Sequence, residues 1–273
     1  MRETVMAAAP KLADPFDSTR PALGCLGATT TLRDFALVTY DVDAARLAAL
    51  LPTGCGMEPE TVTLPGAGTR ALVSAVNFRD VDFRFRLAPS LRATFVQTNY
   101  RAYVRRGPER AVWFFGTTLA SHLSALPRLA WGMPWHRVRA DLEAVWDGER
   151  CLAYESSSHG AWGSARMTLA GDEGAAPGLT GFANEAEALL VLTHPLIGYF
   201  AHRRGGIGRY TVWHERLEPT AGRVLDARFD VFEKLGLVAP DQQPHSVLLQ
   251  RETEFLVELP PGRPRGRALA APT

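Results

Sequence analysis

The chain has 273 residues, of which 46% are apolar and 22% charged, and its formal net charge at pH 7 is +1. A chain of this length buries enough surface for a sizeable hydrophobic core without disulfides or metals. The near-neutral charge offers no basic surface for nucleic acid or an anionic membrane, and no apolar run reaches the 18 residues of a membrane-spanning helix. Neither nucleic acid nor a membrane is therefore expected as a partner.

Cysteine and lysine usage restricts the chemistry further. Cys25, Cys55 and Cys151 are widely spaced and form neither a CxxC nor a Cys/His ligand pattern, which predicts free thiols and no metal site. No apolar region of signal length occurs near the start, so the cytoplasm is the expected location. Lysine occurs only at Lys11 and Lys234, which leaves very few amines for Schiff-base chemistry.

Short alternating or apolar runs bounded by turn residues predict strands along most of the chain. These runs are 35–40, 71–85, 95–105, 111–119, 136–146, 150–157, 161–169, 209–217, 223–232 and 247–259. Helices are predicted after Asp41 or Asp43, over 121–130, and after Asn184, where short polar side chains can cap a first turn.

This pattern predicts an α+β fold dominated by one antiparallel sheet, closed into a barrel or cone with a few peripheral helices. Residues 1–30 carry several prolines and glycines without periodicity and are expected to form a flexible arm. Residues 31–260 are expected to form a single domain, and the Arg-, Gly-, Ala- and Pro-rich segment 261–273 a disordered tail.

The strand over 95–105 carries the most distinctive polar pattern. Gln97, Asn99 and Arg101 project from one face at every second position, and Phe95 and Tyr103 share that face. Inside a closed sheet these residues would form a polar wall of two amides and one permanent cation, suited to a carboxylate or an enolate. On a solvent-facing strand the same residues would need no function. The two aromatic neighbours favour the cavity interpretation.

A second candidate region follows at 131–136, with the sequence Trp-Gly-Met-Pro-Trp-His. His136 is the residue of this segment that can transfer a proton near neutral pH, although it can equally be a partly buried histidine bonded to a carbonyl. Trp135 could stack against an apolar substrate or simply belong to the core. His122, on the preceding predicted helix, is a weaker candidate for the same site.

The order of these segments resembles the domain of unknown function 2071 family, which belongs to the acetoacetate decarboxylase-like superfamily. The resemblance covers residues 33–260 and is most specific around Asn99 and Arg101. The other segments that carry it are 47–52, 112–115, 134–135, 203–206 and 244–248. The resemblance implies a β-cone or barrel around a small-molecule cavity, commonly in a homo-oligomer.

The chain departs from the acetoacetate decarboxylases at two positions of this resemblance. In those enzymes a Gly-x-Pro is followed by two lysines, one of which forms the Schiff base, whereas this chain has Trp135 and His136. The position of Gln97, often a glutamate in the related family, lacks a carboxylate. The resemblance therefore implies a cavity without the Schiff-base chemistry of decarboxylases.

Two leading hypotheses remain open at this stage, besides a structural or partner-binding role, which would need a large exposed apolar patch. The first is an enzyme of the lyase, isomerase or cyclase kind that acts on an apolar carbonyl-containing substrate without a cofactor. The second is a protein that binds a small molecule in the same cavity without chemistry. The candidate catalytic residues are Gln97, Asn99, Arg101 and His136, and the candidate substrate-binding residues are Trp113, Trp135, Tyr103 and His122.

Overall fold

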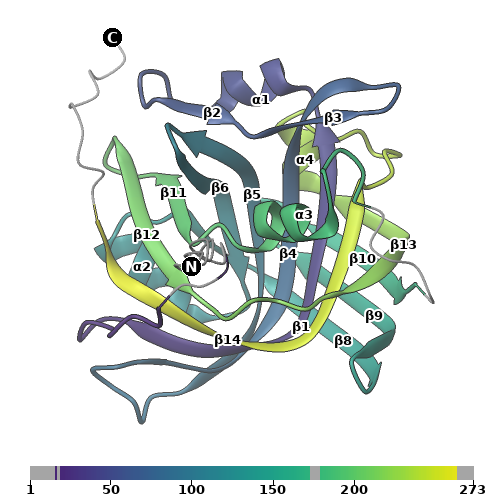
Figure 1. The fold of residues 1–273 in the computed structure, drawn as a ribbon. Coiled ribbons are helices and arrows are strands. Elements are labelled where there is room, and N and C mark those ends of the chain that lie inside the picture. The colour runs from purple at the N-terminus through teal and green to yellow at the C-terminus, as the bar shows by residue number, and fades with distance from the viewer. Residues whose placement is uncertain (1–15, 17–18, 173–178, 263–273) are drawn as a thin grey trace, which may run out of the picture.

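The computed structural model describes residues 16, 19–172 and 179–262, and strands dominate this part of the chain (Figure 1). The strands are β1 (Ala28–Val42), β2 (Met57–Pro59), β3 (Thr61–Leu64), β4 (Gly68–Phe85), β5 (Ala93–Arg106), β6 (Glu109–Leu119), β7 (Trp135–Arg137), β8 (Arg139–Asp147), β9 (Arg150–His159), β10 (Ala165–Gly171), β11 (Ile197–Ala201), β12 (Ile207–Trp213), β13 (Thr220–Phe229) and β14 (Ser246–Gly262). The helices are α1 (Ala44–Leu50), η1 (His122–Ser124), α2 (Ala125–Ala130), α3 (Glu185–Thr193) and α4 (Asp230–Lys234). The prediction of many strands with a few helices is confirmed.

The strands form a hydrogen-bonded path that returns to its start. β1, β4, β5, β6, β11, β12 and β14 pair in that order, and β14 also pairs with β1, so these strands form the sheet ring (Figure 1). Most pairs are antiparallel, as expected, but β7 and β11 both run parallel to β6. Parallel neighbours need a crossover connection. The chain supplies one through η1 and α2 before β7, and a longer one before β11.

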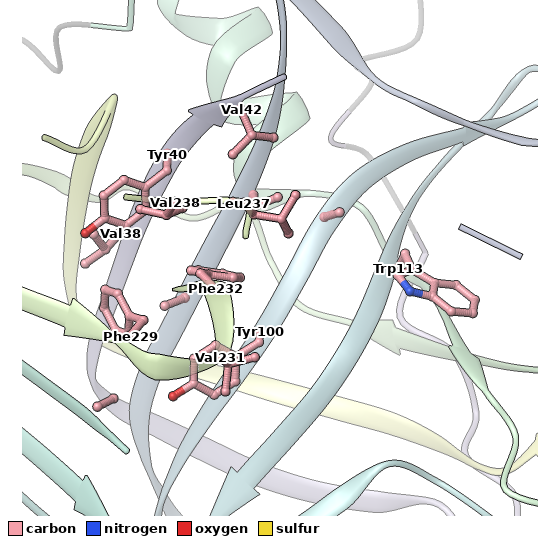
Figure 2. Close-up of a cluster of buried hydrophobic side chains, with 14 of the residues drawn as sticks. Val38, Tyr40, Val42, Tyr100, Trp113, Phe229, Val231, Phe232, Leu237 and Val238 are labelled. Atoms are coloured by element: carbon pink, nitrogen blue, oxygen red, sulfur yellow. The ribbon is translucent and has the colours of Figure 1, made fainter. Parts of the chain in front are cut away.

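A second group of strands, in the order β13, β10, β9 and β8, joins the ring where β13 pairs briefly with β14. The main hydrophobic cluster contains residues of both groups, including Tyr100 of β5 and Tyr154 of β9. Figure 2 shows Tyr100 close to Phe229 and Phe232, and the ring centroids of Tyr100 and Phe232 lie 5.5 Å apart. The main core thus lies on the outer side of β5, opposite the face that carries Gln97.

The helix caps follow the sequence closely. Asp43 caps α1 by accepting from the backbone N–H of Arg46 at 2.7 Å, and Asn184 caps α3 by accepting from that of Glu187 at 2.9 Å. Both helices therefore begin where short polar side chains can satisfy a free N–H group.

The prediction of one strand over 223–232 is wrong at its end, because β13 ends at Phe229 and α4 begins at Asp230. The Asp230 carboxylate accepts from the backbone N–H of Ser164 at 3.1 Å, and Val231 and Phe232 are buried. Tertiary packing therefore overrides the local preference of this segment.

At the amino-terminal side, β1 begins at Ala28, and the preceding Leu23 is buried against Trp213 and Leu256. Most of segment 1–18 and the end of the predicted tail, 263–273, lie outside the described residues. No helix in the described ranges is long and apolar enough to cross a membrane.

Candidate active site

A cavity of about 100 Å³ is lined by residues from every strand of the sheet ring. Its wall is mostly apolar, with a small number of polar side chains. The apolar lining residues include Leu32, Phe35, Val76, Phe78, Val112, Phe114, Met133 and Trp135. The polar ones are Thr30, Asp80, Gln97, Asn99, Arg101, Thr193, Tyr210 and His214. A mostly apolar cavity with a few convergent polar groups is the usual form of a small-molecule site.

The alternation of β5 directs its polar residues into this cavity. Gln97, Asn99 and Arg101 all line it, while Tyr100 and Ala102, at even positions, belong to the main core on the other side of the strand. The structure therefore answers the question of orientation that the sequence left open. This face of β5 is the polar wall of the cavity.

The two amides of the wall are fixed by a short hydrogen-bond chain. Thr117 Oγ1 donates to Asn99 Oδ1 at 2.8 Å, and Gln97 Nε2 donates to the same oxygen at 3.0 Å. An amide nitrogen carries two N–H groups, so Gln97 retains one donor after this bond and Asn99 retains both of its own. The wall therefore offers oriented N–H donors to a ligand oxygen.

Arg101 lies where the end of α3 meets β5. Its Nη2 donates to the backbone carbonyl of Leu192 at 2.8 Å, and Tyr103 OH donates to the same carbonyl at 3.0 Å. In Figure 1, α3 is drawn in front of β4 and β5, in agreement with these bonds. The carbonyls at a helix carboxyl end carry partial negative charge and favour a cation there.

The Arg101 guanidinium nevertheless retains unused binding capacity. Its Nε is buried without a hydrogen-bond partner, and no carboxylate of the described residues forms an ion pair with it. A buried cation without an anionic partner is costly, and an anion brought by a ligand would relieve that cost. This end of the cavity is suited to a carboxylate.

Asp80 forms a second polar group of the cavity, on β4. The residue is 3% exposed, Thr30 Oγ1 donates to its Oδ1 at 3.0 Å, and its Oδ2 is buried without a partner among the described residues. Burial raises the pKa of the Asp80 carboxyl to about 7, and the hydrogen bond from Thr30 opposes this shift only in part. Asp80 is therefore poised between its acid and base forms near neutral pH.

His214 and Tyr210 stand near Arg101 and remain uncharged at neutral pH. Burial lowers the pKa of His214 to about 4, although its Nδ1 lies 2.7 Å from the carbonyl of Glu215. Its ring stacks on Phe255 at 4.4 Å. Burial also raises the pKa of the Tyr210 hydroxyl. Neither side chain competes with a ligand anion for Arg101.

The remaining residues predicted from sequence lie outside the lining, except Trp135. His136 follows Trp135 on β7 and faces the other way, where its ring stacks on Trp162 at 4.2 Å. Burial, together with Arg128 and Arg203, lowers the pKa of His136 to about 4. The imidazole is therefore neutral and is separated from the polar wall by β7 itself.

Three other candidates are also displaced from the cavity wall. Trp113 belongs to the main core, and Figure 2 shows it apart from the cluster around Tyr100. His122 is exposed, with its Nε2 2.8 Å from Arg137 Nη2. Tyr103 is buried beside Arg101, and its hydroxyl donates to the backbone carbonyl of Leu192 at the end of α3. Its contact with the site is indirect, through Arg101.

Sequence reasoning missed Asp80 and His214. Asp80 continues the even-numbered face of β4, on which Val76 and Phe78 point into the cavity. An acidic residue on this otherwise apolar face was the feature of the sequence that could have identified it. Its partner Thr30 comes from β1, and no local pattern reveals that pairing. Within the described ranges, no group of three or more His, Cys, Asp or Glu side chains could hold a metal ion.

The fold of the chain is similar to that of solved acetoacetate decarboxylase-like proteins. An acetoacetate decarboxylase-like enzyme from Sphingomonas wittichii RW1 aligns with a TM-score of 0.57 and 13% identity, over 86% of this chain and 91% of that one. Acetoacetate decarboxylase from Legionella pneumophila aligns with a TM-score of 0.55 and 13% identity, over 93% and 96%. The enduracididine biosynthesis enzyme MppR, complexed with pyruvate, aligns with a TM-score of 0.55 and 15% identity, over 84% and 87%. These likenesses establish the fold.

Sequence gives the narrower assignment. The family model DUF2071, described as an uncharacterized conserved protein, matches residues 29–254, and the chain belongs to this family. The family resemblance inferred from sequence is thereby confirmed. No curated protein matches the chain significantly in sequence.

Proposed function

We propose that the protein is a small-molecule enzyme of the lyase, isomerase or cyclase kind, which acts on an apolar carbonyl compound that also carries a carboxylate. The observation that carries this proposal is the unpaired, partly buried Arg101 guanidinium on the wall of an otherwise apolar cavity. Arg101 holds the carboxylate, and the amide N–H groups of Gln97 and Asn99 hold the carbonyl oxygen. The presence of pyruvate in MppR supports an oxo acid as the ligand class.

The size of the cavity limits the substrate. At roughly 10–15 Å³ for each water-sized position, a cavity of about 100 Å³ admits about seven to ten non-hydrogen atoms. A short oxo acid with an unbranched apolar linker satisfies this limit. Its carbonyl lies at the Gln97 end of the wall and its carboxylate at the Arg101 end.

The proposed chemistry does not use a Schiff base. Trp135, at the position of the first lysine after the Gly-x-Pro of acetoacetate decarboxylases, lines the cavity with an indole ring. Lys234 is directed elsewhere, because its Nζ donates to the backbone carbonyl of Trp162 at 3.3 Å. Lys11 lies outside the described residues. Borohydride treatment in the presence of a small oxo acid is therefore expected to trap no covalent adduct.

Several broader features belong to the same proposal. We take the sheet ring to be the closed barrel or cone that encloses the substrate, within a single domain over residues 31–260 that works as a homo-oligomer in the cytoplasm. The hydrogen-bonded return of β14 to β1 supports the closure.

The test uses a matched pair of ligands, 6-oxoheptanoate and 2-heptanone, which differ by the carboxylate. Isothermal titration calorimetry compares wild type, Arg101→Met and, as a control, Arg139→Met, which removes an exposed arginine. Wild type and the control should bind the acid about ten- to one-hundred-fold more tightly than the ketone, as a charged hydrogen bond provides, and Arg101→Met should lose this preference. Equal affinity of wild type for both ligands would contradict the proposal.

A second candidate function, binding without turnover, is favoured by one observation. The cavity lining contains the indole of Trp135, at one of the two positions where the sequence resemblance implies the lysines of the decarboxylases. If the acid binds as described and no compound of its class is converted, the protein is a binding module that uses the same wall.

A further inference from the structure

We propose that Asp80 is the catalytic acid and base of this site, and that it moves a proton between the carbon next to the substrate carbonyl and its own Oδ2. This inference rests on the proposed function, because the substrate is the oxo acid held by Arg101 and the amide wall. It assigns the proton transfer to a residue of β4 and selects proton exchange or isomerisation as the reaction type.

The position of Asp80 relative to the amides supports this role. In the pairing of β4 with β5, Asp80 lies opposite Phe95, so Gln97 is its diagonal neighbour on the same face. Diagonal neighbours of this kind are about 7–8 Å apart between backbone positions, and side chains bridge that gap readily. A carbonyl whose oxygen accepts from Gln97 therefore presents its adjacent carbon toward Asp80.

The hydrogen bonds around Asp80 leave one oxygen available. Oδ1 accepts from Thr30, which fixes the carboxyl group, whereas Oδ2 has no partner among the described residues. A buried polar atom without a partner is rare in native structures and needs an explanation. A substrate C–H or O–H group placed against Oδ2 supplies that explanation.

Two observations indicate that the charge of Arg101 does not affect the pKa of Asp80. Only burial and the Thr30 hydrogen bond shift the pKa of Asp80, and no charged side chain contributes. Along β5, the backbone position opposite Asp80 lies six residues from that of Arg101, or about 20 Å between backbone positions at roughly 3.3 Å per residue, although both side chains extend into the same cavity. Arg101 therefore binds the remote carboxylate without suppressing the basicity of Asp80.

The proton transfer is balanced without a cofactor. Ionised Asp80 accepts the proton from the carbon next to the carbonyl, and the electron pair of the broken C–H bond forms the C=C bond of an enolate. The carbonyl π electrons move to oxygen, where the second N–H of Gln97 stabilises the charge. Protonated Asp80 then returns the proton to carbon, which restores the keto form or, in a conjugated substrate, gives the shifted isomer.

The other titratable groups of the region are less suited to this step. His136 lies on the far side of β7 against Trp162 and does not line the cavity. His214 lines it, but its ring stacks on Phe255 and its Nδ1 is engaged with the carbonyl of Glu215.

The experiment follows deuterium uptake at the carbons next to the ketone of 6-oxoheptanoate in D2O, by proton NMR. Wild type, Asp80→Asn and the exposed-site control Asp241→Asn are compared, and affinities are measured in parallel by calorimetry. Wild type and Asp241→Asn should catalyse uptake, with a rate that rises through about pH 7 as Asp80 ionises. Asp80→Asn should bind the acid with similar affinity and lose at least about one hundredfold in rate, the contribution of a positioned base.

The possible failures are distinguishable. Uptake that Asp80→Asn retains, or binding by wild type without uptake, would overturn the role of Asp80 and leave the proposed binding site intact. Absence of binding by wild type would overturn the proposed function and this inference together. A wild-type rate that does not change between pH 5 and 9 would also contradict Asp80 as the base.

Discussion

The burial of Asp80 makes a quantitative prediction for the variant Asp80→Asn. The pKa of this carboxyl is raised from its ordinary value of 3.8 to about 7 in the folded protein. The folded state therefore binds the proton more tightly than the unfolded state. The contribution of Asp80 to the free energy of unfolding is most favourable below pH 4 and decreases as pH rises toward 7. At roughly 1.36 kcal/mol per pH unit, this linkage costs about 4 kcal/mol above pH 7. An uncharged asparagine avoids that cost.

The assay is urea unfolding of wild type, Asp80→Asn and Asp241→Asn at pH 5 and pH 8. Asp80→Asn should exceed wild type in unfolding free energy by a margin that grows with pH and approaches about 4 kcal/mol at pH 8. Asp241 is exposed, so its variant should show no such pH-dependent gain. A margin that is absent, or that is the same at both pH values, would refute the account of Asp80 as a buried carboxyl held near neutrality.

Three other variants test separate parts of the structure. The free energy of unfolding of Arg101→Met, measured in urea, should be no lower than that of wild type, because the guanidinium that the substitution removes has no anionic partner and is costly to bury. A large loss of stability would show that Arg101 is mainly structural. Thr30→Val should shift the pH midpoint of deuterium uptake upward. The hydrogen bond from Thr30 lowers the pKa of Asp80, so its removal should raise that pKa, and an unchanged midpoint would argue against the contact. Gly116→Ala should lose about 1–3 kcal/mol in urea unfolding, because a Cβ there collides with the Trp162 ring, and wild-type stability would contradict this packing.

The polar wall was predictable because it depends on a local rule. Strict alternation on β5 places Gln97, Asn99 and Arg101 on one face in any strand conformation, and the aromatic residues beside them indicate that the face is enclosed. The same rule shows that Trp135 and His136, as neighbours on one strand, cannot both line the cavity. The structure gives the cavity side to Trp135.

The acid of the site was not predictable, because it depends on pairing between distant strands. Asp80 receives its hydrogen bond from Thr30, 50 residues earlier, and becomes a diagonal neighbour of Gln97 only through the β4–β5 register. The bulge at Asp34, whose φ is +53°, also changes which residues of β1 face inward, so both Leu32 and Phe35 reach the cavity. Alternation in the sequence alone cannot predict which residues face inward beyond such a bulge.

We propose that the cavity inside the sheet ring holds an oxo acid between Gln97 and Arg101. A crystal structure of the protein with 6-oxoheptanoate tests it most directly. We expect the carboxylate within hydrogen-bond distance of the Arg101 guanidinium, and the ketone oxygen on Gln97 Nε2 with its neighbouring carbon facing Asp80. A ligand bound outside the ring, or inside it with the carboxylate away from Arg101, would show that this binding mode is wrong.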